Sequence, residues 1–288
     1  MNSKIIENTA KQLQQNFDAE LIALQYNNNK NVFPSAQQVL EVIHELQKIL
    51  FAEYFQSNTL HGLRSIQPVV RDLIWQSFYC VHAKSGYQQN SIDEQADELS
   101  WQLLQQLPQI RLLLDTDATA AYNGDPACEA RFLPVLCYPS MLALLYHRVA
   151  HVLYQYKIPI LPRIITELAH SQTGIDIHPG AQIGESFFID HGTGVVIGET
   201  TIIGHHVKMY HGVTLGAKSF PVDENGNCIK NIKRHPIIGN HVIIYSNAVI
   251  LGRINIGDNS VIGGNVCLTE SVPNNSHVYQ RAQKEISD

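Results

Sequence analysis

Two short segments of the sequence combine side chains that exchange protons with side chains that bind charged groups. The first holds Asp190 and His191 in the run D-H-G-T-G, and the second ends in Lys233, Arg234 and His235. An imidazole can accept and return a proton near neutral pH, and a guanidinium can bind a carboxylate through two parallel hydrogen bonds. A carboxylate, two imidazoles and a guanidinium at these places favour a catalytic site over the alternative, which is surface decoration.

Both segments interrupt a six-residue repeat in the second half of the chain. The spacing between successive repeated aliphatic residues is six, except for eight between Ile189 and Ile197 and twenty-three between Leu215 and Ile238. Neither a 3.6-residue helical period nor strand alternation produces this pattern, which is typical of a β-helix built from hexapeptide units. The repeated residues are Ile177, Ile183, Ile189, Ile197, Ile203, Met209, Leu215, Ile238, Ile244, Ile250, Ile256, Ile262 and Leu268.

The repeat predicts how the two polar segments are positioned. Each repeated aliphatic side chain should point inward and stack on its equivalent in the next coil, and three units per coil give a little over four coils. The glycine that often follows it suits a tight corner. The eight-residue step must push two residues out of the wall at 190–194. The long step extrudes a loop, 219–235, in which Asn225 and Gly226 are a type I′ hairpin signal. Such breaks are where function collects on a repeat scaffold.

The first 173 residues are expected to be helical. Of the 18 glycines, 15 occur at Gly174 or later, so the composition changes near residue 173. Ser35 and Gln38 resemble a capping box, and Gly124 and Pro126 suit the end of a helical run. The predicted fold class is α+β, with a helical domain at 1–173, a β-helix at 174–278 and a tail at 279–288. Apolar periodicity predicts helices at 36–55, 69–82, 91–107, 110–122 and 140–156.

The helix predicted at 140–156 carries His147 and His151 four residues apart. Zinc proteases place two histidine ligands at this spacing with a glutamate base directly after the first. Here Arg148 stands in the glutamate's position. A packed or surface histidine pair is therefore the favoured interpretation.

Composition excludes several classes of function. The formal charge is -6, from 20 Lys+Arg against 26 Asp+Glu, and the absence of a basic block argues against nucleic-acid binding. We find no signal peptide and no apolar run of the ~18 residues that a membrane span needs, so a cytoplasmic protein is expected. The five cysteines form no C-x-x-C pair and should be free thiols. The low charged fraction, 16%, suggests apolar surface buried between subunits.

Five motifs together resemble serine O-acetyltransferase, a member of the hexapeptide-repeat acyltransferase superfamily. They are D-x-A-C at 125–128, D-I-H-P at 176–179, D-H-G-T-G at 190–194 with I-G-E-T at 197–200, V-T-L-G at 213–216 and R-H-P at 234–236. The resemblance implies transfer of an acetyl group from acetyl-CoA to the hydroxyl of L-serine, which gives O-acetyl-L-serine for cysteine biosynthesis. It also implies a left-handed β-helix, a homotrimer or dimer of trimers, and sites between neighbouring subunits.

The resemblance also implies roles for individual residues. His191 is the base that takes the serine proton, and Asp176 bonds the far ring nitrogen of His191, as in a catalytic dyad. Because L-cysteine carries the same amino and carboxylate groups as serine, it is expected to inhibit. The residues expected to bind serine are Arg234 and His235 at its carboxylate, and Asp125 and Asp190 at its ammonium group.

The cofactor and partner expectations rest on the same resemblance. The pantetheine arm of acetyl-CoA should lie against Gly216, Ala217, Ser246 and Gly264, and no metal is expected. Many family members end in an isoleucine that docks into cysteine synthase, whereas this chain ends in the residues 286–288, Ile-Ser-Asp. No stable complex with that synthase is predicted.

Two alternatives of other kinds remain at this point. One is a zinc enzyme like the γ-class carbonic anhydrases, in which His206 and His211, at H-x4-H spacing, and His241 would hold the metal. The other is a hexapeptide acyltransferase that acts on another hydroxyl, such as that of a sugar. The zinc alternative leaves D-H-G-T-G and R-H-P unexplained, and the sugar alternative gives Arg234 no carboxylate to bind.

Overall fold

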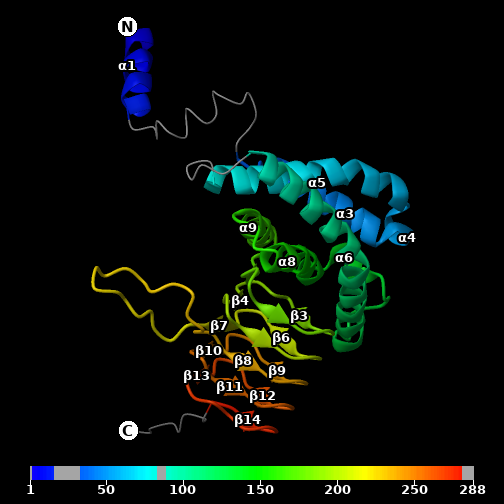
Figure 1. Cartoon of the computed structure of the whole chain (residues 1–288). Helices are drawn as coiled ribbons and strands as arrows, with labels where there is room; N and C mark the ends of the chain where they lie inside the picture. Colours follow the sequence, from blue (N-terminus) through cyan, green and yellow to red (C-terminus); the bar gives the residue numbers. More distant parts are fainter. Residues whose placement is uncertain (1, 16–32, 83–88, 281–288) are drawn as a thin grey trace.

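The computed structural model describes residues 2–15, 33–82 and 89–280. In Figure 1 a group of helices lies at one end of a parallel β-helix, and a long loop leaves the β-helix on one side. The last eight residues, which carry the expectation about cysteine synthase, lie outside the described ranges. No helix in the described ranges combines the length and the hydropathy that a membrane span requires. All five cysteines are unpaired, as predicted.

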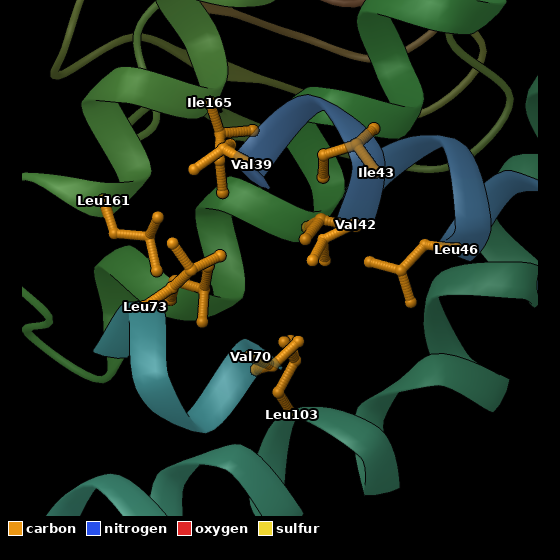
Figure 2. Close-up of a pocket in the computed structure, with 11 residues that line it drawn as sticks. Val39, Val42, Ile43, Leu46, Val70, Leu73, Leu103, Leu161 and Ile165 are labelled. Carbon is orange, nitrogen blue, oxygen red and sulfur yellow. The ribbon is translucent and has the colours of Figure 1, made fainter. Parts of the chain in front are cut away.

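The helical part is built around aliphatic side chains. Valine, leucine and isoleucine from α3, α5, α6, α8 and α9 meet around a void of about 20 Å³, as Figure 2 shows. A lining without polar groups makes this an ordinary packing defect and excludes it as a substrate site. The helices are α1 (Asn2–Gln15), α3 (Ala36–Leu50), α4 (Ala52–Phe55), α5 (Thr59–His82), α6 (Gln89–Gly124), α7 (Leu133–Cys137), α8 (Pro139–Gln155) and α9 (Leu161–Thr173).

Four of the five predicted helices differ from the structure. The helix expected at 69–82 begins ten residues earlier, at Thr59, and contains Pro68. The helix expected at 36–55 breaks at Phe51, because Arg111 donates to the carbonyl of Leu50, which a continuing helix would use for its own ladder. The stretches at 91–107 and 110–122 form one helix, α6, that passes through Pro108. Leu107 and the residue at 110 are both buried, so packing on either side of the proline keeps the helix continuous. Ser35 makes no side-chain cap.

The β-helix has three parallel sheets, each built from one strand of successive coils. Sheet A has the order β1-β4-β7-β10-β13, sheet B has β11-β8-β5-β2 and sheet C has β14-β12-β9-β6-β3. The chain turns three corners per coil, which we call A/B, B/C and C/A. The strands are β1 (Asp176–Ile177), β2 (Gln182–Ile183), β3 (Phe188–Asp190), β4 (Val196–Ile197), β5 (Ile202–Ile203), β6 (Lys208–Tyr210), β7 (Thr214–Gly216), β8 (Ile237–Ile238), β9 (Ile243–Ile244), β10 (Val249–Leu251), β11 (Asn255–Ile256), β12 (Val261–Ile262), β13 (Cys267–Leu268) and β14 (His277–Val278).

The repeated aliphatic residues stack as predicted. Ile177, Ile197 and Leu215 are paired in register in sheet A, and Ile189 and Met209 are paired in sheet C. All five are buried. The β-helix continues past the last repeat position, residue 268. Residue 272 follows after a step of only four residues and forms a parallel bridge with residue 256. That short step hid a further partial coil, which ends in β14.

The repeat glycines have a different role from the one predicted. Gly204, for example, is not in the left-handed region, but a methyl group there would lie 2.5 Å from Oδ1 of Asn240 and 2.8 Å from the carbonyl carbon of Gly239. The glycine therefore lets successive coils approach each other. The left-handed backbone that turns the B/C corner occurs two residues later, at Ser186, His206, His241, Asn259 and Asn275.

A buried ion pair joins the helices to the β-helix. Arg148 of α8 donates from Nε and Nη2 to the two carboxylate oxygens of Asp117 of α6, at 2.7 and 2.8 Å. Nη2 of Arg148 also donates to the carbonyl of Gly184, and Asp117 accepts from the backbone N–H of Phe187. Both side chains are almost fully buried, and a buried pair is sustained only when its remaining hydrogen bonds are made in this way. The pair fixes the end of α6 relative to β3.

The extruded loop is an ordered hairpin that projects away from the β-helix between β7 and β8 (Figure 1). Val222 and Cys228 form an antiparallel bridge. The predicted type I′ turn was wrong, because Gly226 has a positive φ of 80° but Asn225 does not. The backbone N–H of Gly226 donates to the carbonyl of Asp223, which is the pattern of a three-residue hairpin loop closed by a left-handed glycine.

Candidate active site

The eight-residue step places His191 at the C/A corner, directly after β3. His191 has a left-handed φ of 59°, and Gly192 follows with a φ of 87°. A methyl group on Gly192 would lie 2.4 Å from Cδ1 of Ile175, so the bulge needs glycine there. The imidazole is 74% exposed. A strained backbone that holds a reactive side chain in solvent is an arrangement found at functional sites.

A lysine that the sequence interpretation missed holds the neighbouring carboxylate. Nζ of Lys208 lies 3.4 Å from Oδ2 of Asp190 and donates to the carbonyl of Gly124 at 2.6 Å. Gly124 is the last residue of α6, where a cation is favoured by the helix dipole. Oδ1 of Asp190 lies 3.9 Å from Nε2 of His191. Lys208 thus ties the helical part to the corner that carries the candidate base.

Asp125 follows α6 and reaches the same corner. Its carboxylate accepts from the hydroxyl of Tyr138 at 2.5 Å and from the backbone N–H of Ala127 at 2.8 Å. These two bonds, in that order, hold the pKa of Asp125 below its ordinary value, and the nearby charges of Lys208 and His191 act in the same direction. Asp125, Asp190 and His191, all predicted to act on the substrate, therefore lie together.

Asp176 lies in β1, half-buried on the outer face of sheet A. No hydrogen bond joins Asp176 to His191 among the described residues, and the charge of Asp176 acts on the imidazole of His178. A dyad between the two requires the exposed imidazole of His191 to turn toward β1. The role predicted for Asp176 stays a prediction.

Arg234 lies at the other edge of sheet A, at the A/B corner. Its Nη2 donates to Oε2 of Glu199 at 2.8 Å, and its Nη1 donates to the carbonyl of Ile232 at 3.2 Å. The hydroxyl oxygen of Thr200 accepts from the backbone N–H groups of Arg234 and His235. Glu199 and Thr200 belong to the I-G-E-T motif, and their side chains hydrogen-bond the residues at the end of the hairpin.

His235 is buried and neutral at physiological pH. Its Nδ1 accepts from the backbone N–H of Thr200 at 3.0 Å, so Nε2 carries the ring proton and is a donor. Burial, and then the charge of Arg234, lower the pKa of His235 from 6.5 to about 4. The ring packs against Gly198, where a methyl group would lie 2.1 Å from Cδ2 of the imidazole.

The lowered pKa of His235 predicts a pH dependence of stability. Between pH 6.5 and about 4 the unfolded chain binds a proton at this residue and the folded chain does not. Stability from His235 is therefore complete above pH 6.5 and is lost as the pH falls toward 4. We expect the urea midpoint of wild type to fall more steeply between pH 7 and 4.5 than that of His235→Gln. Equal slopes for the two proteins would contradict the buried, neutral assignment.

The predicted cofactor residues divide between the same two corners. Gly216 ends β7 and Ala217 follows it at the A/B corner, whereas Ser246 and Gly264 stack at the C/A corner. A methyl group on Gly264 would lie 3.2 Å from the carbonyl oxygen of Ser246. Beside the C/A corner, the rings of Tyr210 and Tyr245 stack with centroids 5.1 Å apart. Tyr210 is paired in register with Asp190, so the two stacked rings lie on the coils that follow Asp190 in sheet C.

The histidines of the zinc alternative do not share one corner. His206 and His241 stack at the B/C corner with ring centroids 4.8 Å apart, and His211 lies at the C/A corner, 5.9 Å from His191. The described residues contain no group of three metal-ligating side chains. The pair His147 and His151 is packed, as expected, with His147 buried and Nδ1 of His151 bonded to a backbone carbonyl.

Comparison with known proteins decides the family. Residues 235–270 match the family described as bacterial transferase hexapeptide (six repeats). A curated protein of Synechococcus elongatus, "Serine acetyltransferase, plasmid", is 46% identical over 264 residues, which cover 86% of this chain and 82% of that protein. The chain belongs to the serine acetyltransferase family. The motif resemblance found in the sequence is thereby confirmed.

Solved serine acetyltransferases agree with this assignment over the whole fold. The isoform 3 enzyme of Entamoeba histolytica, in complex with cysteine, has a TM-score of 0.71 and 35% identity and covers 93% of each chain. A serine acetyltransferase in complex with CoA has a TM-score of 0.55 and 26% identity, over 83% of this chain and 95% of that one. The predicted fold class, helices followed by a hexapeptide β-helix, is confirmed.

Proposed function

We propose that this chain transfers an acetyl group from acetyl-CoA to the hydroxyl of L-serine and releases O-acetyl-L-serine and CoA. One observation carries the proposal beyond family membership. The strained C/A corner presents an exposed imidazole beside two carboxylates, and the A/B corner presents a guanidinium beside a neutral imidazole donor. The first set can take a proton from a hydroxyl and bind an ammonium group, and the second set can bind a carboxylate. A serine molecule carries these three groups.

In the proposed reaction His191 takes the hydroxyl proton of serine while the oxygen attacks the thioester carbonyl of acetyl-CoA. The tetrahedral intermediate then expels the CoA sulfur, and the imidazolium returns the proton to it. Asp176 is proposed to bond the far ring nitrogen and stabilise the imidazolium. Asp125 and Asp190 bind the substrate ammonium group, and Arg234 and the Nε2–H group of His235 bind its carboxylate.

The division of the site between two corners favours a threefold assembly. In one chain the two corners lie at opposite edges of sheet A, and no contact joins His191 to Arg234 in the described part of the chain. A closed ring sets one edge of each subunit against the opposite edge of the next. We propose that each site forms between the C/A corner of one copy and the A/B corner of its neighbour, in a trimer or a pair of trimers. The acetyl-CoA residues, divided in the same way, would meet there.

The function is tested by measuring CoA release from acetyl-CoA with L-serine, homoserine, threonine and amino sugars as acceptors. We expect L-serine to be preferred to the amino sugars, because an amino sugar has no carboxylate for Arg234 and His235 to bind. Release with an amino sugar but not with L-serine would favour the other acyltransferase alternative.

L-cysteine is expected to compete with serine for the same site. It carries the same amino and carboxylate groups, and solved relatives are described in complex with cysteine. Added L-cysteine should raise the apparent KM for L-serine and leave the maximal rate unchanged. An inhibition that high serine does not relieve would contradict binding by the same groups.

A further inference from the structure

The guanidinium of Arg234 has its plane fixed before any substrate binds. Nη2 donates to Glu199 and Nη1 donates to the carbonyl of Ile232, while Nε is buried and has no hydrogen-bond partner among the described residues. A guanidinium has five N–H donors in one plane. Two protein contacts therefore set its orientation and leave further donors for a ligand. Glu199 provides the only charged contact of the two.

Glu199 is itself held from the helical part of the chain. The hydroxyl of Tyr154, near the end of α8, donates to Oε1 of Glu199 at 3.3 Å, while Oε2 accepts from Arg234. Burial alone would raise the pKa of Glu199, but the bond from Arg234 and the nearby charge of His178 bring it below its ordinary value. The carboxylate is thus ionised and has one oxygen on each neighbour.

The first coil is shaped around the ring of Tyr154. At the A/B corner between β1 and β2, a methyl group on Gly180 would lie 3.0 Å from Cζ and 3.1 Å from the hydroxyl oxygen of Tyr154. The ring of His178 meets the tyrosine edge-on, with centroids 5.8 Å apart, and Nδ1 of His178 accepts from the backbone N–H of Gly180. These contacts hold the phenol in one place although 39% of the residue is exposed.

We propose that Tyr154 and Glu199 are positioning residues that orient Arg234 toward the substrate carboxylate. Through Tyr154 the helical part contributes to substrate affinity at a corner of the β-helix. The proposal rests on the proposed function, since it takes the ligand of Arg234 to be the carboxylate of L-serine. Neither residue touches the reacting atoms, so their loss should weaken serine binding more than it slows the chemical step.

The variant Tyr154→Phe tests this directly, because it keeps the ring against Gly180 and removes only the hydroxyl. We expect the KM for L-serine to rise by roughly three- to tenfold, the range of one ordinary hydrogen bond, because the bond from Tyr154 to Glu199 is long, at 3.3 Å, and reaches Arg234 only through Glu199. The kcat and the KM for acetyl-CoA should stay close to their wild-type values. The control is Tyr156→Phe, one residue past α8, whose hydroxyl has no hydrogen bond among the described residues.

A double variant separates this role from general damage. Glu199→Gln should raise the KM for L-serine more than Tyr154→Phe, and the double variant should resemble Glu199→Gln alone, because Tyr154 acts through Glu199. Gly180→Ala, whose methyl group would crowd both the phenol of Tyr154 and the carbonyl of Glu199, should raise the KM for L-serine at least as much as Tyr154→Phe. Additive effects, or equal losses toward both substrates, would overturn the proposal. If wild type acetylates L-serine and Tyr154→Phe has an unchanged KM for L-serine, the positioning role is overturned and the proposed function stands. If wild type is inactive toward L-serine, the proposed function is overturned as well.

Discussion

His191→Ala is expected to lower kcat for serine acetylation by ~10² to 10⁴, the usual contribution of a positioned general base. The serine hydroxyl is a weak nucleophile, and among the described residues no other imidazole at the C/A corner is as open to solvent as that of His191, which is 74% exposed. Binding of L-serine, measured by calorimetry, should change little, because Arg234 and the two carboxylates remain. The measurement is the rate of CoA release at saturating substrates.

The matched control for this variant is His206→Ala. His206 is an exposed corner histidine with a φ of 56°, close to the 59° of His191, so replacing either residue changes the same kind of backbone. His206 lies at the B/C corner, stacked on His241 and away from the proposed site. Activity of His206→Ala should equal that of wild type. A kcat for His191→Ala within about tenfold of wild type would remove His191 from the role of base.

The β-helix could be predicted in detail because each coil repeats the same packing of inward aliphatic side chains. The same inward position recurs every six residues, so thirteen weak signals add to one strong one, and the pairing of Ile177 with Ile197 follows by counting. The helices offered no such redundancy. The break at Phe51 depends on Arg111, sixty residues away in the sequence, and the passage of α6 through Pro108 depends on packing on both sides. Helix propensity is a property of local sequence, so it cannot predict contacts between residues that are far apart in the chain.

The candidate site was predictable in its residues and less so in its arrangement. The breaks in the repeat identified His191 and Arg234, but the supporting groups Lys208 and Glu199 occupy ordinary outward positions. Counting three units per coil would have shown Lys208 beside Phe188 and Tyr210 beside Asp190. The same count assigns His191 and Arg234 to different corners. The carbonyl of α6 that Lys208 bonds could not be found this way, because it depends on how the helices dock.

Activity should be recovered when two inactive variants assemble together. Arg234→Ala is expected to lower kcat/KM for L-serine by roughly 10²-fold, since it removes the partner of a carboxylate, and His191→Ala removes the base. If each site takes His191 from one copy and Arg234 from the next, a mixed ring contains sites with both intact residues. Random mixing in equal amounts makes about a quarter of all sites complete, and every mixed trimer has about one complete site in three. Co-expression with two different affinity tags, followed by purification on both, selects the mixed assemblies.

The control is a chain that carries both substitutions, co-expressed with each single variant in turn. A site needs one copy with His191 and a neighbour with Arg234, and the doubly substituted chain supplies neither, so these mixtures should stay inactive. If instead both residues acted within one chain, the mixture of the two single variants would also stay inactive, because no chain in it has an intact pair. Recovery to between about a quarter and a third of wild-type activity therefore distinguishes a site between copies from a site within one. It does so without relying on the assembly's measured size, which would be the same in both cases.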